Sequence, residues 1–269
     1  MITLVGRMQK ISVAIPTYFS SKYLPVLLKS LIGLINIDEI VISEDSNNQN
    51  ETKNIKKIIN KFISKNKSID ISFYENKDNL GAFDNKFIAI SKCKNDIVYQ
   101  IDSDNIAAKN LDKTLFKILN NFDDDNIYYP SSLKQFFYNY QYYLNSNDNN
   151  VNLSLETKII NSLLISDSLN SDKKITIDKN VFWILNCGNF IVSRKNYINT
   201  MEVFNRNSTI PLAADALAIS YLWLNSGKSI VLFKDFYHYH RKRNDSVSLS
   251  LGEESEKSFS YFREKFKSL

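Results

Sequence analysis

Short apolar runs alternate with segments of helical periodicity from Ile11 to Leu119, and this alternation constrains the fold more than any other feature. Strands that alternate with helices of roughly 10–15 residues are typical of βαβ units. We therefore predict an α/β domain with a mostly parallel sheet. The expected strands are Ile11–Ile15, Glu39–Ser43, Ile69–Tyr74 and Ile97–Ile101, and the expected helices are 22–35, 55–63, 83–90 and 111–119.

The second half of the chain has weaker periodicity. Residues 130–180 are rich in Tyr, Phe, Asn and Ser, and we interpret them as an insertion. The segment Leu153–Leu164 is its best candidate helix. The remaining expected elements are strands at Ile127–Tyr129, within 181–193 and at Ser229–Phe233, and helices at Ala213–Leu224 and Glu253–Lys267.

Composition excludes several classes of protein. The sequence has no apolar run of 18 residues, so we expect no membrane span. It has two Cys, too few for a disulfide scaffold or a Cys-built zinc site. A net charge of +5, spread over the chain, does not call for nucleic acid as a partner. We expect a cytoplasmic protein without a signal peptide, and we leave open whether it associates peripherally with a membrane.

Polar side chains follow the predicted strands at the points where they end. In an open parallel sheet, ligands bind at the carboxyl ends of the strands. Pro16, Thr17 and Tyr18 follow the first strand, and Glu44 and Asp45 follow the second. We therefore expect a ligand site at this edge of the sheet.

The segment Asp102-Ser103-Asp104 follows the fourth strand and is the sharpest of these signals. Hard divalent cations prefer oxygen ligands, and Mg²⁺ or Mn²⁺ often bridges a carboxylate to substrate phosphates. Two acids at a strand end can hold such an ion. The alternative is a turn or helix cap, because Asp and Asn favour both.

Taken in order, the segments ISVAIPTYF, EIVISEDSN, NKDNLGAFDNK and IVYQIDSDN resemble the nucleotide-binding half of family 2 glycosyltransferases. The resemblance implies the GT-A fold, with a Rossmann-like, mostly parallel central sheet flanked by helices and a C-terminal acceptor-side portion. We expect a single domain over residues 1–269. Its implied parts are a nucleotide-binding half at 10–110, an acceptor-side half at 111–252 that contains the insertion, and a C-terminal helix at 253–269.

The resemblance also implies roles for individual residues. Tyr18 matches an aromatic that stacks on the nucleotide base, and Asp45 with Glu44 matches an acid pair that accepts a hydrogen bond from it. Lys86 stands where the family often has Arg near the nucleotide. The residues implied at the nucleotide are Pro16, Thr17, Tyr18, Glu44, Asp45, Lys86, Asp102 and Ser103.

A second group of implied residues concerns the metal, the diphosphate and the sugar. Asp102, Asp104 and His240 match positions that hold Mn²⁺ or Mg²⁺. His238, Arg241 and Arg243 lie in the run FYHYHRKRNDSVS, which resembles a basic loop over the diphosphate or the metal, and His238 is the alternative to His240 as the metal ligand. A basic surface loop beside an edge strand is the alternative. Gly188 and Asn189 match a place where sugar and acceptor approach the backbone, with a buried Cys beside a turn Gly as the alternative.

Asp215 lies near the start of an otherwise apolar helix, where the family has an acid that serves as general base. An acceptor hydroxyl must lose its proton as the C1 bond breaks, and a carboxylate opposite the leaving diphosphate would take it and invert the anomeric centre. The family often has Glu-Asp here, whereas Ala214 precedes Asp215 in this chain. The alternative role is a favourable placement of negative charge at a helix N-terminus.

The predicted activity is that of an inverting, metal-dependent glycosyltransferase. It would use a nucleotide-diphosphate sugar, with UDP favoured, and a hydroxyl of a glycan or lipid-linked acceptor. A non-catalytic relative that binds glycan or a partner protein is one alternative. A nucleotidyltransferase is a weaker one, because the segment PTYFSSKYL after the first strand lacks the glycines of a phosphate loop. The oligomeric state stays open.

Overall fold

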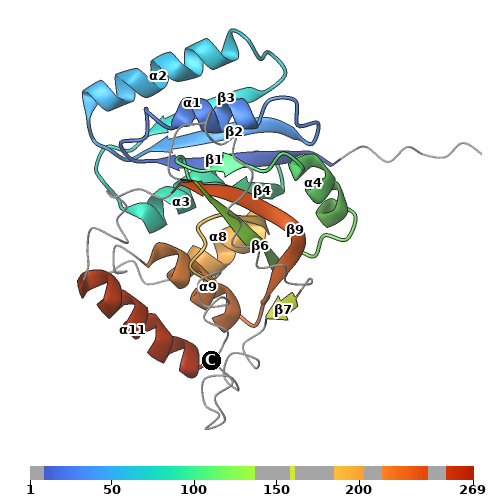
Figure 1. Cartoon of the computed structure of the whole chain (residues 1–269). Coiled ribbons are helices and arrows are strands. Elements are labelled where there is room, and N and C mark those ends of the chain that lie inside the picture. Colours follow the sequence, from blue (N-terminus) through green and yellow to red (C-terminus); the bar gives the residue numbers. More distant parts are fainter. Residues whose placement is uncertain (1–8, 137–157, 161–184, 203–213, 242–252) are drawn as a thin grey trace, which may run out of the picture.

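The computed structural model describes residues 9–136, 158–160, 185–202, 214–241 and 253–269 (Figure 1). Its first half is a parallel sheet in which the strands lie in the order β3-β2-β1-β4. This confirms the predicted α/β class. The strands are β1 (Ile11–Thr17), β2 (Ile37–Glu44), β3 (Asp70–Glu75) and β4 (Ile97–Gln100), and the helices between them are α1 (Leu24–Ser30), α2 (Gln49–Ile63) and α3 (Ala82–Ser91).

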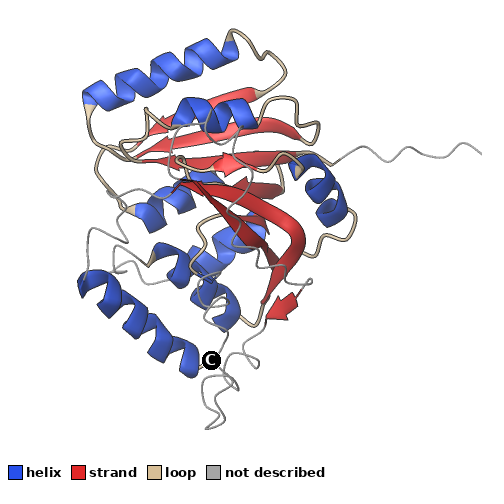
Figure 2. Ribbon diagram, in the orientation of Figure 1, coloured by secondary structure: helices blue, strands red, loops and turns tan. Residues whose placement is uncertain are grey.

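Helices cover both faces of this sheet, as Figure 2 shows. Successive side chains of a strand point to opposite faces, so a strand covered on both sides reads as a continuous apolar run. In β1, Val13 and Ile15 pack with α1, α2 and α4 (Leu111–Leu119), whereas Ala14 packs on the opposite side with α3. Because both faces of the sheet are buried, the apolar runs of the sequence correctly indicated strands.

The sheet continues with antiparallel and parallel pairs beyond β4. β8 pairs antiparallel with β4, and β6 lies between β8 and β9. The described residues form one nine-stranded sheet through both halves of the chain. Its remaining strands are β5 (Ile106–Ala107), β6 (Asn126–Phe136), β7 (Lys158–Ile160), β8 (Phe190–Ser193) and β9 (Ser229–Arg241).

The helix predicted at Leu153–Leu164 is wrong where the structure describes it. Lys158–Ile160 is the strand β7, which pairs antiparallel with β9. A short apolar run carries no periodicity that separates helix from strand, so the partner strand decides. The other residues of that prediction lie outside the described part, as does most of the 130–180 segment.

β9 is longer than the predicted strand Ser229–Phe233 because it continues past a bulge. Phe233 pairs with Pro130 of β6 and Tyr237 pairs with Ser132, so the residues between them have no regular partner. Asp235 in this bulge has φ +68°, and its carboxylate accepts from Lys117 of α4. A bulge bends a strand and re-aims it. The second half of β9 thereby reaches β5, directly after the Asp102 turn.

Three helices pack below the sheet in Figure 1, namely α8 (Arg194–Glu202), α9 (Asp215–Asn225) and α11 (Glu253–Lys267). Of these three helices, α8 was not expected from the sequence. The amphipathic helix α11 was predicted with the correct bounds, and it contributes Phe262 and Phe266 to the core shared with α9. Among the described helices, none combines the length and apolar character needed to cross a bilayer.

Candidate active site

The ends of β1 and β2 lie at the same level, because Thr17 pairs with Glu44 in the parallel ladder. Pro16 and Thr17 are buried, and only Tyr18 of the three predicted residues opens to solvent, with 49% of its surface exposed. The Tyr18 and Phe19 rings meet edge to face at 4.9 Å. Of these three residues, Tyr18 is the one whose ring a base could reach, and the neighbouring Phe19 ring is exposed as well.

Glu44 is fully buried beneath this edge. Its carboxylate accepts from the Thr17 hydroxyl and from the Ser46 N–H, which lies 2.9 Å away. Burial raises the pKa of Glu44, although the hydrogen bonds from Ser46 and Thr17 oppose it. Glu44 therefore holds the ends of two strands together from inside the protein.

Asp45 faces a turn of the chain. Its oxygens accept from the backbone N–H of Leu80 at 2.9 Å and of Gly81 at 2.9 Å, and from the Asn76 amide at 2.9 Å. Gly81 has φ +85°, which favours glycine and sets the start of α3. Asp45 thus fixes the turn before α3, and its contact with a base stays a prediction.

We expect Glu44→Gln to change how stability depends on pH. The folded-state pKa of Glu44 is raised, so the folded protein binds a proton more readily than the unfolded chain and loses stability as pH rises above about 4.5. Gln removes this loss. In thermal unfolding from pH 4 to 7, the Tm difference between variant and wild type should shift in favour of the variant as pH rises. A Tm difference between variant and wild type that stays constant from pH 4 to 7 would contradict a raised pKa of Glu44.

Hydrogen bonds join the Asp102 turn to the segment directly before β8. The Asp102 N–H donates to Asn189 Oδ1 at 2.7 Å, and the Gln100 amide donates to both Asp102 Oδ1 at 3.2 Å and Gly188 O at 2.9 Å. Asn189 is buried. These contacts place Gly188 and Asn189 directly beside the Asp102 turn, with the side chain of Asn189 turned inward. Whether they touch a sugar or acceptor stays a prediction.

Lys86 brings together two acids that are far apart in the sequence. Its Nζ lies 2.6 Å from Asp215 Oδ2 and 3.0 Å from Asp102 Oδ1. Lys86 comes from α3, Asp215 from the first turn of α9, and Asp102 from the turn after β4. Burial lowers the pKa of Lys86, but the carboxylates of Asp102 and Asp215 outweigh it and raise the pKa above the usual value. The ammonium therefore stays charged.

Asp104 lies on the other side of this turn, beside the end of β9. Arg241 Nε donates to the Asp104 carbonyl at 3.1 Å, and the Arg241 N–H donates to Asn105 Oδ1 at 3.2 Å. His240 precedes Arg241 on the same strand and is half-buried. His238 lies two residues before His240, on the same face of β9. It is buried, and burial lowers its pKa. Arg243 lies outside the described residues.

The predicted metal ligands are Asp102, Asp104 and His240. In the described part of the chain, no group of three or more His, Cys, Asp or Glu could hold an ion by itself. Asp102 is engaged by Lys86. Asp104 and His240 lie on adjoining segments and offer one carboxylate and one imidazole. The carboxylate suits Mg²⁺ or Mn²⁺ with phosphate and water as further ligands, whereas an imidazole is a less usual ligand for such hard ions, and the metal site stays a prediction.

Sequence reasoning did not single out two of the polar residues that build this edge. Asn85, buried on α3, donates to the Thr17 carbonyl at 3.1 Å, and Gln100 links Asp102 to Gly188. A buried amide inside an apolar helix or strand is the signal that could have identified them, because it must find hydrogen-bond partners.

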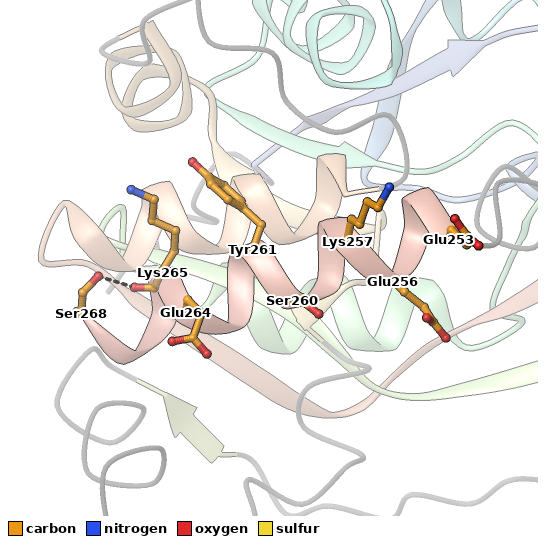
Figure 3. A pocket seen from close by; sticks show the side chains of 8 residues that line it. All are labelled: Glu253, Glu256, Lys257, Ser260, Tyr261, Glu264, Lys265 and Ser268. Carbon is orange, nitrogen blue, oxygen red and sulfur yellow. Dashed lines mark hydrogen bonds between the residues drawn. The ribbon is translucent and has the colours of Figure 1, made fainter.

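A separate hollow of about 920 Å³ runs along α11 (Figure 3). Charged and polar side chains of α11 and its C-terminal neighbour Ser268 line it. None of the residues at the strand ends contributes to it. The lining residues are Glu253, Glu256, Lys257, Ser260, Tyr261, Glu264, Lys265 and Ser268.

Comparisons with known proteins bear on the whole fold. The sequence model of glycosyl transferase family 2 matches residues 12–185. A search of curated proteins finds no match. Crystal structures of S. aureus TarS are similar in fold. TarS 1–349 in complex with UDP has a TM-score of 0.57 and 17% identity over 94% of this chain and 65% of that one.

Two further TarS structures agree with this similarity. TarS 1–349 in complex with UDP-GlcNAc has a TM-score of 0.60 and 16% identity, and the match covers 96% of this chain and 66% of that one. A longer TarS structure has a TM-score of 0.57 and 17% identity, with 88% of this chain and 37% of that chain covered. The chain thus spans less than two thirds of the first of these structures.

Proposed function

The chain belongs to glycosyl transferase family 2, and from this premise we propose that it transfers a sugar from a nucleotide-diphosphate sugar to an acceptor hydroxyl. The sheet and its flanking helices have the GT-A arrangement of the TarS structures. We further propose that transfer inverts the anomeric centre and depends on a divalent metal ion. The acceptor class that we propose is a glycan or a lipid-linked saccharide.

The observation that carries this proposal is that Asp215 lies beside the strand-end acid Asp102, with Lys86 between them. Asp215 and Asp102 share the Lys86 ammonium at 2.6 and 3.0 Å, although they come from opposite halves of the chain. A glycosyltransferase needs a base close to the place where the donor diphosphate is held. A carboxylate at the edge where nucleotides bind satisfies this need.

The chain's own residues account for the chemical step. The Asp215 carboxylate takes the proton of the acceptor hydroxyl while the hydroxyl oxygen forms a bond to C1 of the donor sugar. The bond from C1 to the diphosphate oxygen breaks, and the nucleoside diphosphate leaves with the electron pair. The proton ends on Asp215, and attack opposite the leaving group inverts C1.

The donor side is held by residues at the other strand ends. Tyr18 offers an exposed ring to the base, and Arg241 brings a positive charge beside the Asp104 turn. Asp104 and His240 would hold the metal ion, which when bound neutralises negative charge on the leaving diphosphate. UDP is the favoured nucleotide because TarS structures contain UDP and UDP-GlcNAc.

A screen of nucleotide sugars tests the proposed function. Thermal unfolding of the purified chain is measured with UDP, GDP and CDP and with their common sugar derivatives, each with Mn²⁺ or with EDTA. We expect UDP and a UDP-sugar to raise the Tm in the presence of Mn²⁺, and hydrolysis or transfer of that UDP-sugar to follow. No shift and no turnover with any nucleotide sugar would reject the proposal.

A further inference from the structure

We propose that Lys86 is a positioning residue that aligns the Asp215 base with the donor edge, and that Gly188 provides the space in which it does so. This inference deepens the proposed function and rests on it. It differs from the expectation that Lys86 contacts the nucleotide. In our proposal its ammonium forms ion pairs with two carboxylates of the protein.

The burial of Lys86 supports this role. Its side chain is 6% exposed, whereas the side chains of Asp215 and Asp102 are 19% and 30% exposed. The ammonium therefore lies beneath the two carboxylates, which face the site. A buried cation that loses a partner is costly, so both contacts are expected to persist. Lys86 thus holds each acid from below.

The arrangement also fixes distances between separate parts of the chain. Lys86 lies on α3, whose start is set by the Asp45 contacts with the turn at Leu80 and Gly81. A shift of the base by about 1 Å can cost on the order of 100-fold in rate. Since Lys86 contacts Asp215 at 2.6 Å, it transmits the position of the strand ends to the base.

Gly188 makes room for the three charged groups. A Cβ at this position would overlap the Asp102 carboxylate and would stand 2.5 Å from Lys86 Nζ. The Gly188 carbonyl accepts from Gln100, so the backbone cannot easily move away. A side chain here would therefore have to displace the ammonium or the carboxylate, which are the ends of flexible side chains.

The first arm of the test compares turnover with binding. In Lys86→Met, we expect kcat with UDP-GlcNAc, or with the UDP-sugar that the wild type uses, to fall about 100-fold while the Kd for UDP stays within about threefold. Lys86→Arg keeps the charge, so its kcat should be higher than that of Lys86→Met. Measured as log kcat, at least about a third of the loss should be restored. Lys92→Met is the matched control at the exposed end of α3 and should leave both values unchanged.

Two results of this arm would overturn the inference. A Lys86→Met variant with wild-type kcat would show that the base does not depend on the ammonium. A variant that loses UDP affinity while kcat at saturation is kept would make Lys86 a nucleotide ligand. Gly188→Ala should reproduce the fall in kcat, and a fully active Gly188→Ala would remove the role of the space.

The second arm needs no activity and separates failure of the inference from failure of the proposed function. Lys86→Met leaves two acids without their shared cation and should lower the Tm. Adding Asp215→Asn to this variant should raise the Tm again, because it removes one uncompensated charge. If the wild type turns over no nucleotide sugar but this recovery is seen, the ion pair stands and the proposed function fails. Tm losses that simply add would reject the pairing itself.

Discussion

Asp215→Asn is expected to lower kcat for sugar transfer by about 10³-fold, because a general base contributes 10²–10⁴ in rate and an amide cannot accept the proton. The Kd for UDP should stay within about threefold. Asn keeps the shape of the side chain, and Lys86 keeps its contact with Asp102 at 3.0 Å. Transfer kinetics and calorimetric titration with UDP measure the two quantities on the same protein.

Asp235→Asn is the matched control for this substitution. Asp235 also pairs with a lysine, Lys117 at 3.1 Å, but it lies exposed at the bulge of β9. Asn tolerates the positive φ of that position, so the fold should be kept. We expect wild-type turnover from the control. An Asp215→Asn enzyme within tenfold of wild-type turnover would show that another group accepts the proton.

The parallel half of the fold was predictable from the sequence for a physical reason. A central strand covered by helices on both faces needs mostly apolar side chains, and the runs before Pro16 and Ser43 provide them, with Ser12 as a buried polar exception. The helix Leu111–Leu119 was predicted with correct bounds because its apolar side chains recur at helical spacing. In these elements local pattern and tertiary burial coincide.

The second half was less predictable because its strands depend on partners that are remote in the sequence. β9 continues through Lys234 and Asp235, two polar residues that interrupt the apolar pattern. Only the pairing with β6 and β5 extends the strand to Arg241. β7 likewise depends on a remote partner, because its three residues are a strand through their pairing with β9.

The candidate site was also predictable only in part. The strand-end residues could be placed at one edge because parallel strands bring their carboxyl ends together. The contact of Lys86 with Asp215 spans 129 positions, and no local spacing predicts it. Asp102 and Asp104 both match the metal motif in the sequence, and Asp104 is favoured there for direct ligation of the ion. In the structure Asp102 contacts the ammonium on one side, whereas the Asp104 carbonyl contacts Arg241 on the other.

That difference leads to an expected result for Asp104→Asn. We expect the substitution to remove the gain in UDP affinity that Mn²⁺ provides in the wild type, a loss of about 10- to 100-fold in the presence of the ion. Asn is a weaker ligand than a carboxylate for a hard cation. The hydrogen bond from Arg241 Nε to the Asp104 backbone carbonyl does not involve the substituted carboxylate and should be kept. Titrations with UDP in Mn²⁺ and in EDTA measure the effect.

Asp112→Asn provides the control for this experiment. Its carboxylate accepts from the Ile35 N–H, and Asn can still accept that bond. The control should keep the full effect of Mn²⁺ on UDP affinity. If Asp104→Asn keeps it as well, the carboxylate does not hold the ion. If the affinities of Asp104→Asn and wild type agree in EDTA and differ only in Mn²⁺, the loss belongs to the metal and not to the folding of the turn, since a disturbed turn would weaken binding in both solutions.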